Sequence, residues 1–212
     1  MTASFATTVI HKAANNTLLF LMQPCHASAV LLILVMSWPD HKYPMIPHTL
    51  FNIYLHTLWG AILALIWPDL RDHDMLGEVS NFFLGKFPCC GPDLLADRTP
   101  TVEHTLVLVL PFYLITTKRY TVLPASLDMA LLSFFLYAAY HSPMLHVLSL
   151  YSGFNLNYVL VPPALQFLIA AGVWYRFIMY MTALVMMFLT RYILVGSWLL
   201  LVQRQEKNKK QA

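Results

Sequence analysis

Several ionisable side chains lie inside stretches of the chain that are otherwise apolar. They are Cys25, His26, His56, His104, His141, His146, Asp128 and Arg191. Ionisable groups are costly within a lipid bilayer, so their presence in apolar segments points to a function. A histidine that removes the proton of a cysteine leaves a thiolate, and a thiolate attacks esters. A cysteine–histidine pair at the depth of phospholipid ester bonds would therefore suit acyl transfer through a thioester.

The composition places these residues in a membrane protein. The chain has 212 residues, of which 58% are hydrophobic and 11% are charged, a polar share too small for a soluble domain of this length. The net charge is only +3 and the basic residues form no stripe, which argues against nucleic-acid binding. The cysteines Cys25, Cys89 and Cys90 do not form a disulfide framework or a Cys-x-x-Cys metal motif.

The apolar pattern predicts an all-α fold, a polytopic membrane helix bundle of about five transmembrane helices, with six possible. We expect one integral-membrane domain over residues 1–212, with a long loop at 68–101 and a polar, basic tail at 203–212. The predicted spans are about Leu18–Trp38, His48–Trp67, Val102–Thr117, Leu127–Tyr151 and Phe177–Val202. We expect residues 158–174 to form a re-entrant or surface segment. If they formed a sixth span instead, the tail would lie on the other side of the membrane.

The direction of the spans brings three of the candidate residues to one layer. The first and third spans run the same way and the fourth runs oppositely. At 1.5 Å per residue, Cys25 lies about 10 Å and His104 a few ångström past the start of their spans, and His141 lies roughly 15 Å before the end of its span. All three are expected toward one face of the membrane, with His56 nearer the middle. Pro24 is expected to kink the first span just before Cys25.

Each candidate also has a simpler explanation. A single cysteine in an apolar helix is usually a packing residue, and a histidine there often only bonds a neighbouring helix. His26 lies about 100° around a regular helix from Cys25, so it need not face the same cavity. Asn155 and Asn157 could close a turn or hydrogen-bond a lipid head group. Residue types and depth alone leave these alternatives open.

The order of short motifs along the chain resembles the transmembrane protein 164 family. The matching motifs are LLFLMQPCHASAVLLIL, LHTLWGAILALIWP, VEHTLVLVLPFYLI, AAYHSPMLHVLSL, GFNLNYVLVPP and WYRF, and the resemblance covers the chain from about residue 17 to 200. Gln23 stands where the family has an asparagine. The resemblance implies an integral-membrane acyltransferase of an internal membrane such as the endoplasmic reticulum. It also implies that Cys25 is the nucleophile and His104 the catalytic histidine.

Our leading hypothesis is a ping-pong acyltransferase whose partners are a phospholipid donor and a lysophospholipid acceptor. Cys25 would attack the donor ester and His104 would carry the proton. The expected substrate-binding or site-lining residues are His26, His56, His141, Asn155, Asn157 and Arg176. We expect no cofactor and no metal. The alternatives are a membrane lipid or fatty-acid-ester hydrolase with the same pair of residues, and a non-catalytic, lipid-binding membrane scaffold.

Overall fold

All regular secondary structure is helical in the part that the computed structural model describes, which comprises residues 1–14, 16–39, 45–66 and 99–211. The elements of the first half are α1 (Thr2–Ala14), the 3₁₀ turn η1 (Leu18–Met22), α2 (Pro24–Ser37), α3 (Met45–Ile66) and α5 (Thr99–Thr116). Most of the predicted loop at 68–101, with Cys89 and Cys90, lies outside the described residues, and its last three residues begin α5.

The second half forms two long helical rods and a connecting segment of short turns. The first rod comprises α6 (Leu127–Ala139), the π-helical turn η3 (Tyr140–Met144) and α7 (Leu145–Ser152). The connecting turns are η4 (Leu156–Tyr158), α8 (Gln166–Ala170) and η5 (Gly172–Trp174). The second rod comprises α9 (Tyr175–Leu189), the π-helical turn η6 (Thr190–Val195) and α10 (Gly196–Gln211).

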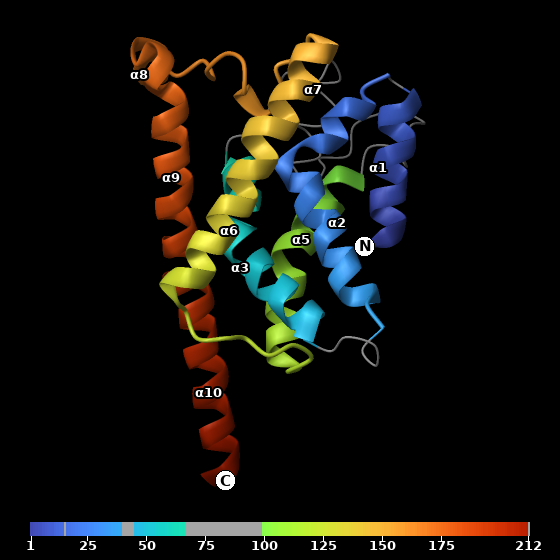
Figure 1. The fold of residues 1–212 in the computed structure, drawn as a ribbon. Coiled ribbons are helices and arrows are strands. Elements are labelled where there is room, and N and C mark those ends of the chain that lie inside the picture. The colour runs from blue at the N-terminus through green and yellow to red at the C-terminus, as the bar shows by residue number, and fades with distance from the viewer. Residues whose placement is uncertain (15, 40–44, 67–98, 212) are drawn as a thin grey trace, which may run out of the picture.

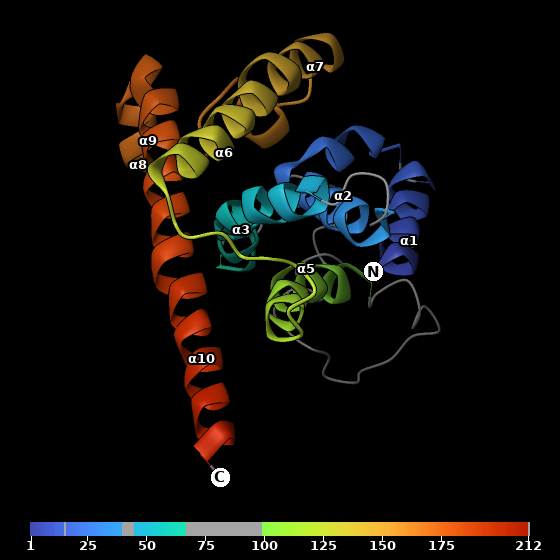
Figure 2. The ribbon, with the colours of Figure 1, turned by 60° about the horizontal axis from the view of Figure 1, so that its bottom comes forward.

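The helix α3 is the centre of the bundle. It contacts α2, α5, α6, α9 and η6, and its side chains Phe51, Tyr54, Leu55 and Leu58 are almost completely buried. Figure 1 shows α1 on the opposite side of the bundle from the rod of α9 and α10. The view in Figure 2 shows that α10 extends beyond the other helices. The core therefore consists of α2, α3 and α5, with the two rods packed on one side.

Two helical stretches are long and apolar enough to cross a membrane. They are the first rod, Leu127–Ser152 with 26 residues, and Gly172–Lys210 with 39 residues, which is η5 together with nearly all of the second rod. Only 17% and 22% of their most apolar windows are buried, so these rods are not the core helices of a soluble protein. Their outward side chains include Phe135, Leu150, Phe177, Val185 and Leu200. The all-α fold with apolar rods agrees with the prediction, but the predicted count of five transmembrane helices is not confirmed.

Three features differ from the sequence-based expectation. The helix α1 was not predicted, although it packs against α5 and begins the described chain. The tail at 203–212 was predicted as a polar extension, and α10 continues through it to Gln211 because glutamine, arginine, glutamate and lysine all favour helix. The predicted span Leu18–Trp38 is two elements, η1 and α2, which meet at Gln23.

Candidate functional site

Cys25 lies in the first turn of α2. Gln23 is extended, with φ −65° and ψ 146°, and Pro24 is the first residue of the helix. The expectation that Pro24 kinks a continuous span is therefore wrong. A proline disfavours helical conformation in the residue before it, and its fixed φ suits the first helical position, so the sequence Gln-Pro starts a helix here.

The surroundings of the Cys25 sulfur are polar on the side of the helix start. The half-buried thiol donates to the side-chain oxygen of Gln23, with 4.0 Å between Sγ and Oε1. The hydroxyl of Tyr140 lies within electrostatic range of the sulfur. The amino end of a helix carries partial positive charge, which stabilises an anion in the first turn. The helix start therefore stabilises a negative charge on the sulfur, whereas the bond to Gln23 stabilises the protonated thiol, so attack by Cys25 requires that this proton be removed.

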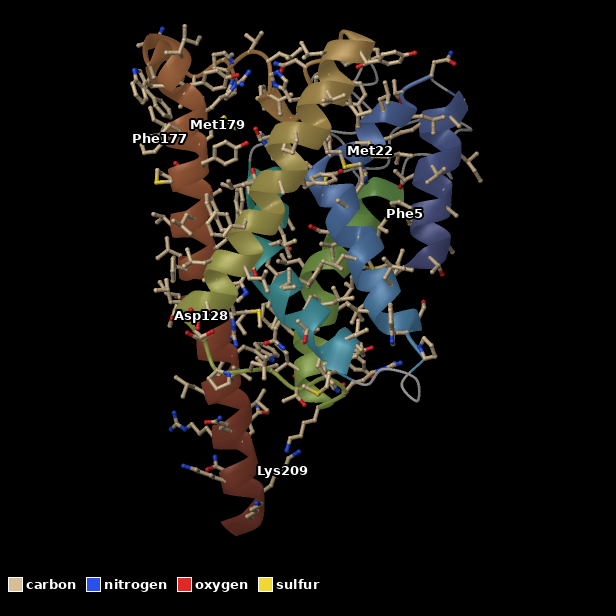
Figure 3. The ribbon with its side chains drawn as sticks, in the orientation of Figure 1. Phe5, Met22, Asp128, Phe177, Met179 and Lys209 are labelled. Atoms are coloured by element: carbon tan, nitrogen blue, oxygen red, sulfur yellow. The ribbon has the colours of Figure 1, made fainter. Side chains whose placement is uncertain are left out.

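His26 faces another part of the bundle from its neighbour Cys25. It is only 3% exposed, and its ring lies against that of Phe5, with 6.4 Å between the centroids. Figure 3 shows Phe5 on α1, beside α2, and Met22 near the start of α2. The contact with α1 is consistent with the 100° that separates successive residues around a helix. His26 thus helps to join α1 to α2.

His104 lies in the second turn of α5, and the position of its side chain is outside the described part of the structure. The helices α2 and α5 contact each other, and both begin at the upper end of the bundle in Figure 1. Cys25 is one residue and His104 five residues past the start of its helix, a difference of about 6 Å along the helix axis. The pairing of the thiol with this imidazole stays a prediction.

Both ring nitrogens of His141 make hydrogen bonds. Nδ1 lies 3.0 Å from the hydroxyl of Tyr180, and Nε2 lies 3.2 Å from the carbonyl oxygen of Asn157. A carbonyl can only accept, so Nε2 carries a proton, and in the neutral ring Nδ1 accepts from Tyr180. His141 could move a proton only by breaking one of these bonds. Its contacts therefore orient the turn η3 relative to α9 and to the segment around Asn157.

The two asparagines stabilise the segment that follows α7. The side chain of Asn155 donates to the carbonyl of Val161 (2.9 Å) and accepts from the N–H of Leu160 (2.8 Å), so it closes a turn. Asn157 adopts a left-handed φ of 45°, a conformation that asparagine tolerates better than most residues. Its carbonyl faces His141 as a result. The predicted role of these asparagines in head-group binding is untested.

Arg176 is exposed at the start of α9. Its Nε donates to the hydroxyl of Tyr175 (3.3 Å), and its guanidinium lies 5.9 Å from the centroid of the Tyr175 ring. It also lies within electrostatic range of His141. An exposed guanidinium next to the apolar rod is suited to a phosphate head group, because arginine offers several donors in one plane.

His56 belongs to a buried polar cluster within α3 and its neighbours. Nδ1 donates to the carbonyl of Asn52 one turn earlier (2.8 Å), and Nε2 is buried without a hydrogen-bond partner. The guanidinium of Arg191, itself 2% exposed, lies within electrostatic range and donates to the carbonyl of Leu123. His56 is thus surrounded by core groups of α3 and η6.

Two polar residues of this arrangement were not singled out from the sequence. Tyr140 directly precedes His141, and its hydroxyl donates to the carbonyl of Met22 at 2.5 Å. Asn52 lies one helical turn before His56, a spacing that could have marked a polar stripe on α3. Among the described residues, no group of three or more histidine, cysteine or acidic side chains could hold a metal ion.

Comparison with known proteins identifies the family. The model of the TMEM164 family matches residues 2–194 of the chain. A similar protein is the Transmembrane protein 164 homolog of Dictyostelium discoideum, which is 28% identical over 146 residues. The match covers 69% of this chain and 45% of that relative, so the chain spans less than half of the relative's length. No solved structure matches. The chain therefore belongs to the TMEM164 family, as the order of its motifs indicates, and the family name together with the apolar rods indicates a membrane protein.

Proposed function

We propose that the protein is a phospholipid acyltransferase that works through a thioester on Cys25. The observation that carries the proposal is the place of the thiol in the first turn of α2, where the helix N-terminus favours a thiolate. The helix α5, which bears His104, packs beside α2 and begins at the same end of the bundle. The apolar sides of the two rods give phospholipids access to the bundle from the bilayer.

The proposed reaction has two half-reactions. The sulfur of Cys25 attacks the carbonyl carbon of the donor ester, its proton passes through His104 to the glycerol oxygen, and the C–O bond breaks to release a lysophospholipid. The hydroxyl of the acceptor lysophospholipid then attacks the thioester and gives its proton to His104. The C–S bond breaks and the sulfur recovers the proton. The acyl chain moves without any cofactor, and the enzyme returns to its starting state.

The head group of the lipid has a candidate site at the same end of the bundle. Arg176 is exposed at the start of α9, and the segment of Asn155 and Asn157 is joined to η3 through His141. The aromatic rings of Phe20 in η1 and Phe154 in this segment lie 5.5 Å apart, so the segment contacts the start of α2. A phosphate bound by Arg176 would therefore lie toward the end of the bundle at which α2 begins.

An internal membrane such as the endoplasmic reticulum is the proposed location.

The proposed acyl transfer is tested by tracing a labelled acyl group from the donor lipid. The purified protein in liposomes is incubated with a phospholipid that carries a radiolabelled acyl chain, with and without a lysophospholipid. We expect a hydroxylamine-sensitive label on the wild-type protein that is absent from Cys25→Ala and present in the matched Cys89→Ala and Cys90→Ala variants. His104→Ala should fold and lose turnover. Product that appears only with acceptor identifies a transferase.

Two results would count against the proposal. Free fatty acid released without acceptor would identify a hydrolase instead. A wild-type protein that acquires no label and turns over neither lipid would leave the non-catalytic scaffold as the better explanation.

A further inference from the structure

Tyr140 joins two parts of the chain that meet beside Cys25. Its hydroxyl donates to the carbonyl of Met22 at 2.5 Å, across 118 residues of sequence. Met22 ends η1, and the extended Gln23 leads directly to the first turn of α2. The bond therefore holds the peptide that comes just before the helix start, and the same hydroxyl lies within electrostatic range of the Cys25 sulfur.

The turn that carries Tyr140 is itself held in place. Pro143 lies in the π-helical turn η3, where the wider backbone accommodates a residue that has no N–H to donate. The neighbouring His141 bonds the Tyr180 hydroxyl of α9 and the Asn157 carbonyl. These bonds tie η3 to two other elements, so Tyr140 offers the Met22 carbonyl a fixed partner. Turns of this π-helical kind often occur at functional sites.

We propose that Tyr140 is a positioning residue for the nucleophile, because its hydroxyl fixes the Met22 carbonyl and thereby the turn from which the Cys25 thiol projects. This inference rests on the proposed acyl transfer. Its consequence is specific: removing the hydroxyl should slow formation of the thioester on Cys25 while the protein remains folded. The ring of Tyr140 would still fill its place in the bundle.

The experiment compares Tyr140→Phe with Tyr151→Phe in a background where Cys89 and Cys90 are serine, so that Cys25 is the sole cysteine. Tyr151 is on the same rod, about three turns away, and is 92% exposed, which makes it a matched loss of one hydroxyl. Rapid-quench measurements with saturating donor phospholipid give the rate and the amplitude of the acylation burst. A second assay, without donor lipid, measures the rate at which a small maleimide alkylates Cys25.

We expect Tyr140→Phe to lower the burst rate about five-fold, the ratio that corresponds to one ordinary hydrogen bond. The burst amplitude per folded molecule and the donor concentration for half-saturation should not change. Alkylation should slow at least about two-fold, because a loosened first turn stabilises the thiolate less. Tyr151→Phe should match the parent protein in both assays.

Equal burst rates in the two variants would overturn the inference. A smaller amplitude at the parent rate would also overturn it, since that result shows a loss of folded protein alone. If the parent protein shows no burst, the proposed function fails and the alkylation assay decides the positioning role. Slower alkylation in Tyr140→Phe than in Tyr151→Phe then supports that role, and equal alkylation rates reject it.

Discussion

Asn52 offers a quantitative test of how the bundle is held together. Its Nδ2 donates to the carbonyls of His48 (2.8 Å) and Thr121 (2.9 Å), and its Oδ1 accepts from the N–H of Leu123 (2.9 Å). The carbonyl of Leu123 in turn accepts from the guanidinium of Arg191. One buried amide in α3 therefore ties the segment between α5 and α6 to the core, close to the second rod.

The substitution Asn52→Leu keeps the size of the side chain and removes the amide. The two bonds to the segment at 121–123 contribute about 1 kcal/mol each to the free energy of unfolding. The Leu123 N–H, left in a part-buried place without its acceptor, costs about another 1 kcal/mol. The bond to His48 lies within α3, and we assign it no separate contribution. The expected loss is about 3 kcal/mol, or about 9 °C in Tm for a protein of this size.

The assay is thermal unfolding in one detergent, followed by circular dichroism, for wild type and Asn52→Leu. The control is Asn208→Leu, which makes the same chemical change at an exposed position of α10 and should shift Tm by less than about 2 °C. If Asn52→Leu lowers Tm no more than the control does, the amide does not tie these elements together and the reasoning fails.

Four further substitutions test individual side chains in the same unfolding assay. Tyr54→Phe removes the buried 2.6 Å bond to the Val107 carbonyl and should cost about 1–3 kcal/mol; an unchanged Tm would contradict this role. Ser126→Ala removes the side chain that caps α6 and should cost about 1 kcal/mol, which a shift below about 1 °C would exclude. His141→Phe should cost about 2 kcal/mol through its two lost bonds, and Tyr180→Phe should reproduce part of that loss, so a stable His141 variant would refute the anchoring role.

The apolar pattern predicted those helices whose ends are marked by the sequence itself. The expected spans His48–Trp67 and Val102–Thr117 correspond to α3 (Met45–Ile66) and α5 (Thr99–Thr116), because charged or proline residues follow each apolar run. The helix α1 has only a moderately apolar composition and no charged capping residue at its start, so the pattern did not reveal it. Its stability comes from packing on α5, which is a tertiary effect.

The sequence predicts a layer for the candidate residues and does not predict their contacts. Depth along the helices predicts that Cys25 and His141 lie toward the same end of the bundle. The bond from the Tyr140 hydroxyl to the Met22 carbonyl joins residues close to each of them in sequence and agrees with this prediction. The contacts of each side chain depend on the direction in which it leaves its helix, since His26 faces α1 and His56 faces the core. Those directions depend on which neighbours pack against α2 and α3, and a single sequence does not specify them.

The prolines show why rules based on neighbouring residues do not predict the whole structure. Pro24 begins a helix and Pro143 lies in a π-helical turn, yet Pro111 lies inside α5 with regular helix on both sides. Pro111 has no N–H to donate to the carbonyl of Val107, four residues earlier, and that carbonyl needs another donor. The hydroxyl of Tyr54 supplies it from α3, at 2.6 Å and fully buried. The helix α5 therefore tolerates its proline because a side chain of a different helix completes its hydrogen bonds. The sequence around Pro111 does not contain this donor, so local rules cannot predict that the helix continues.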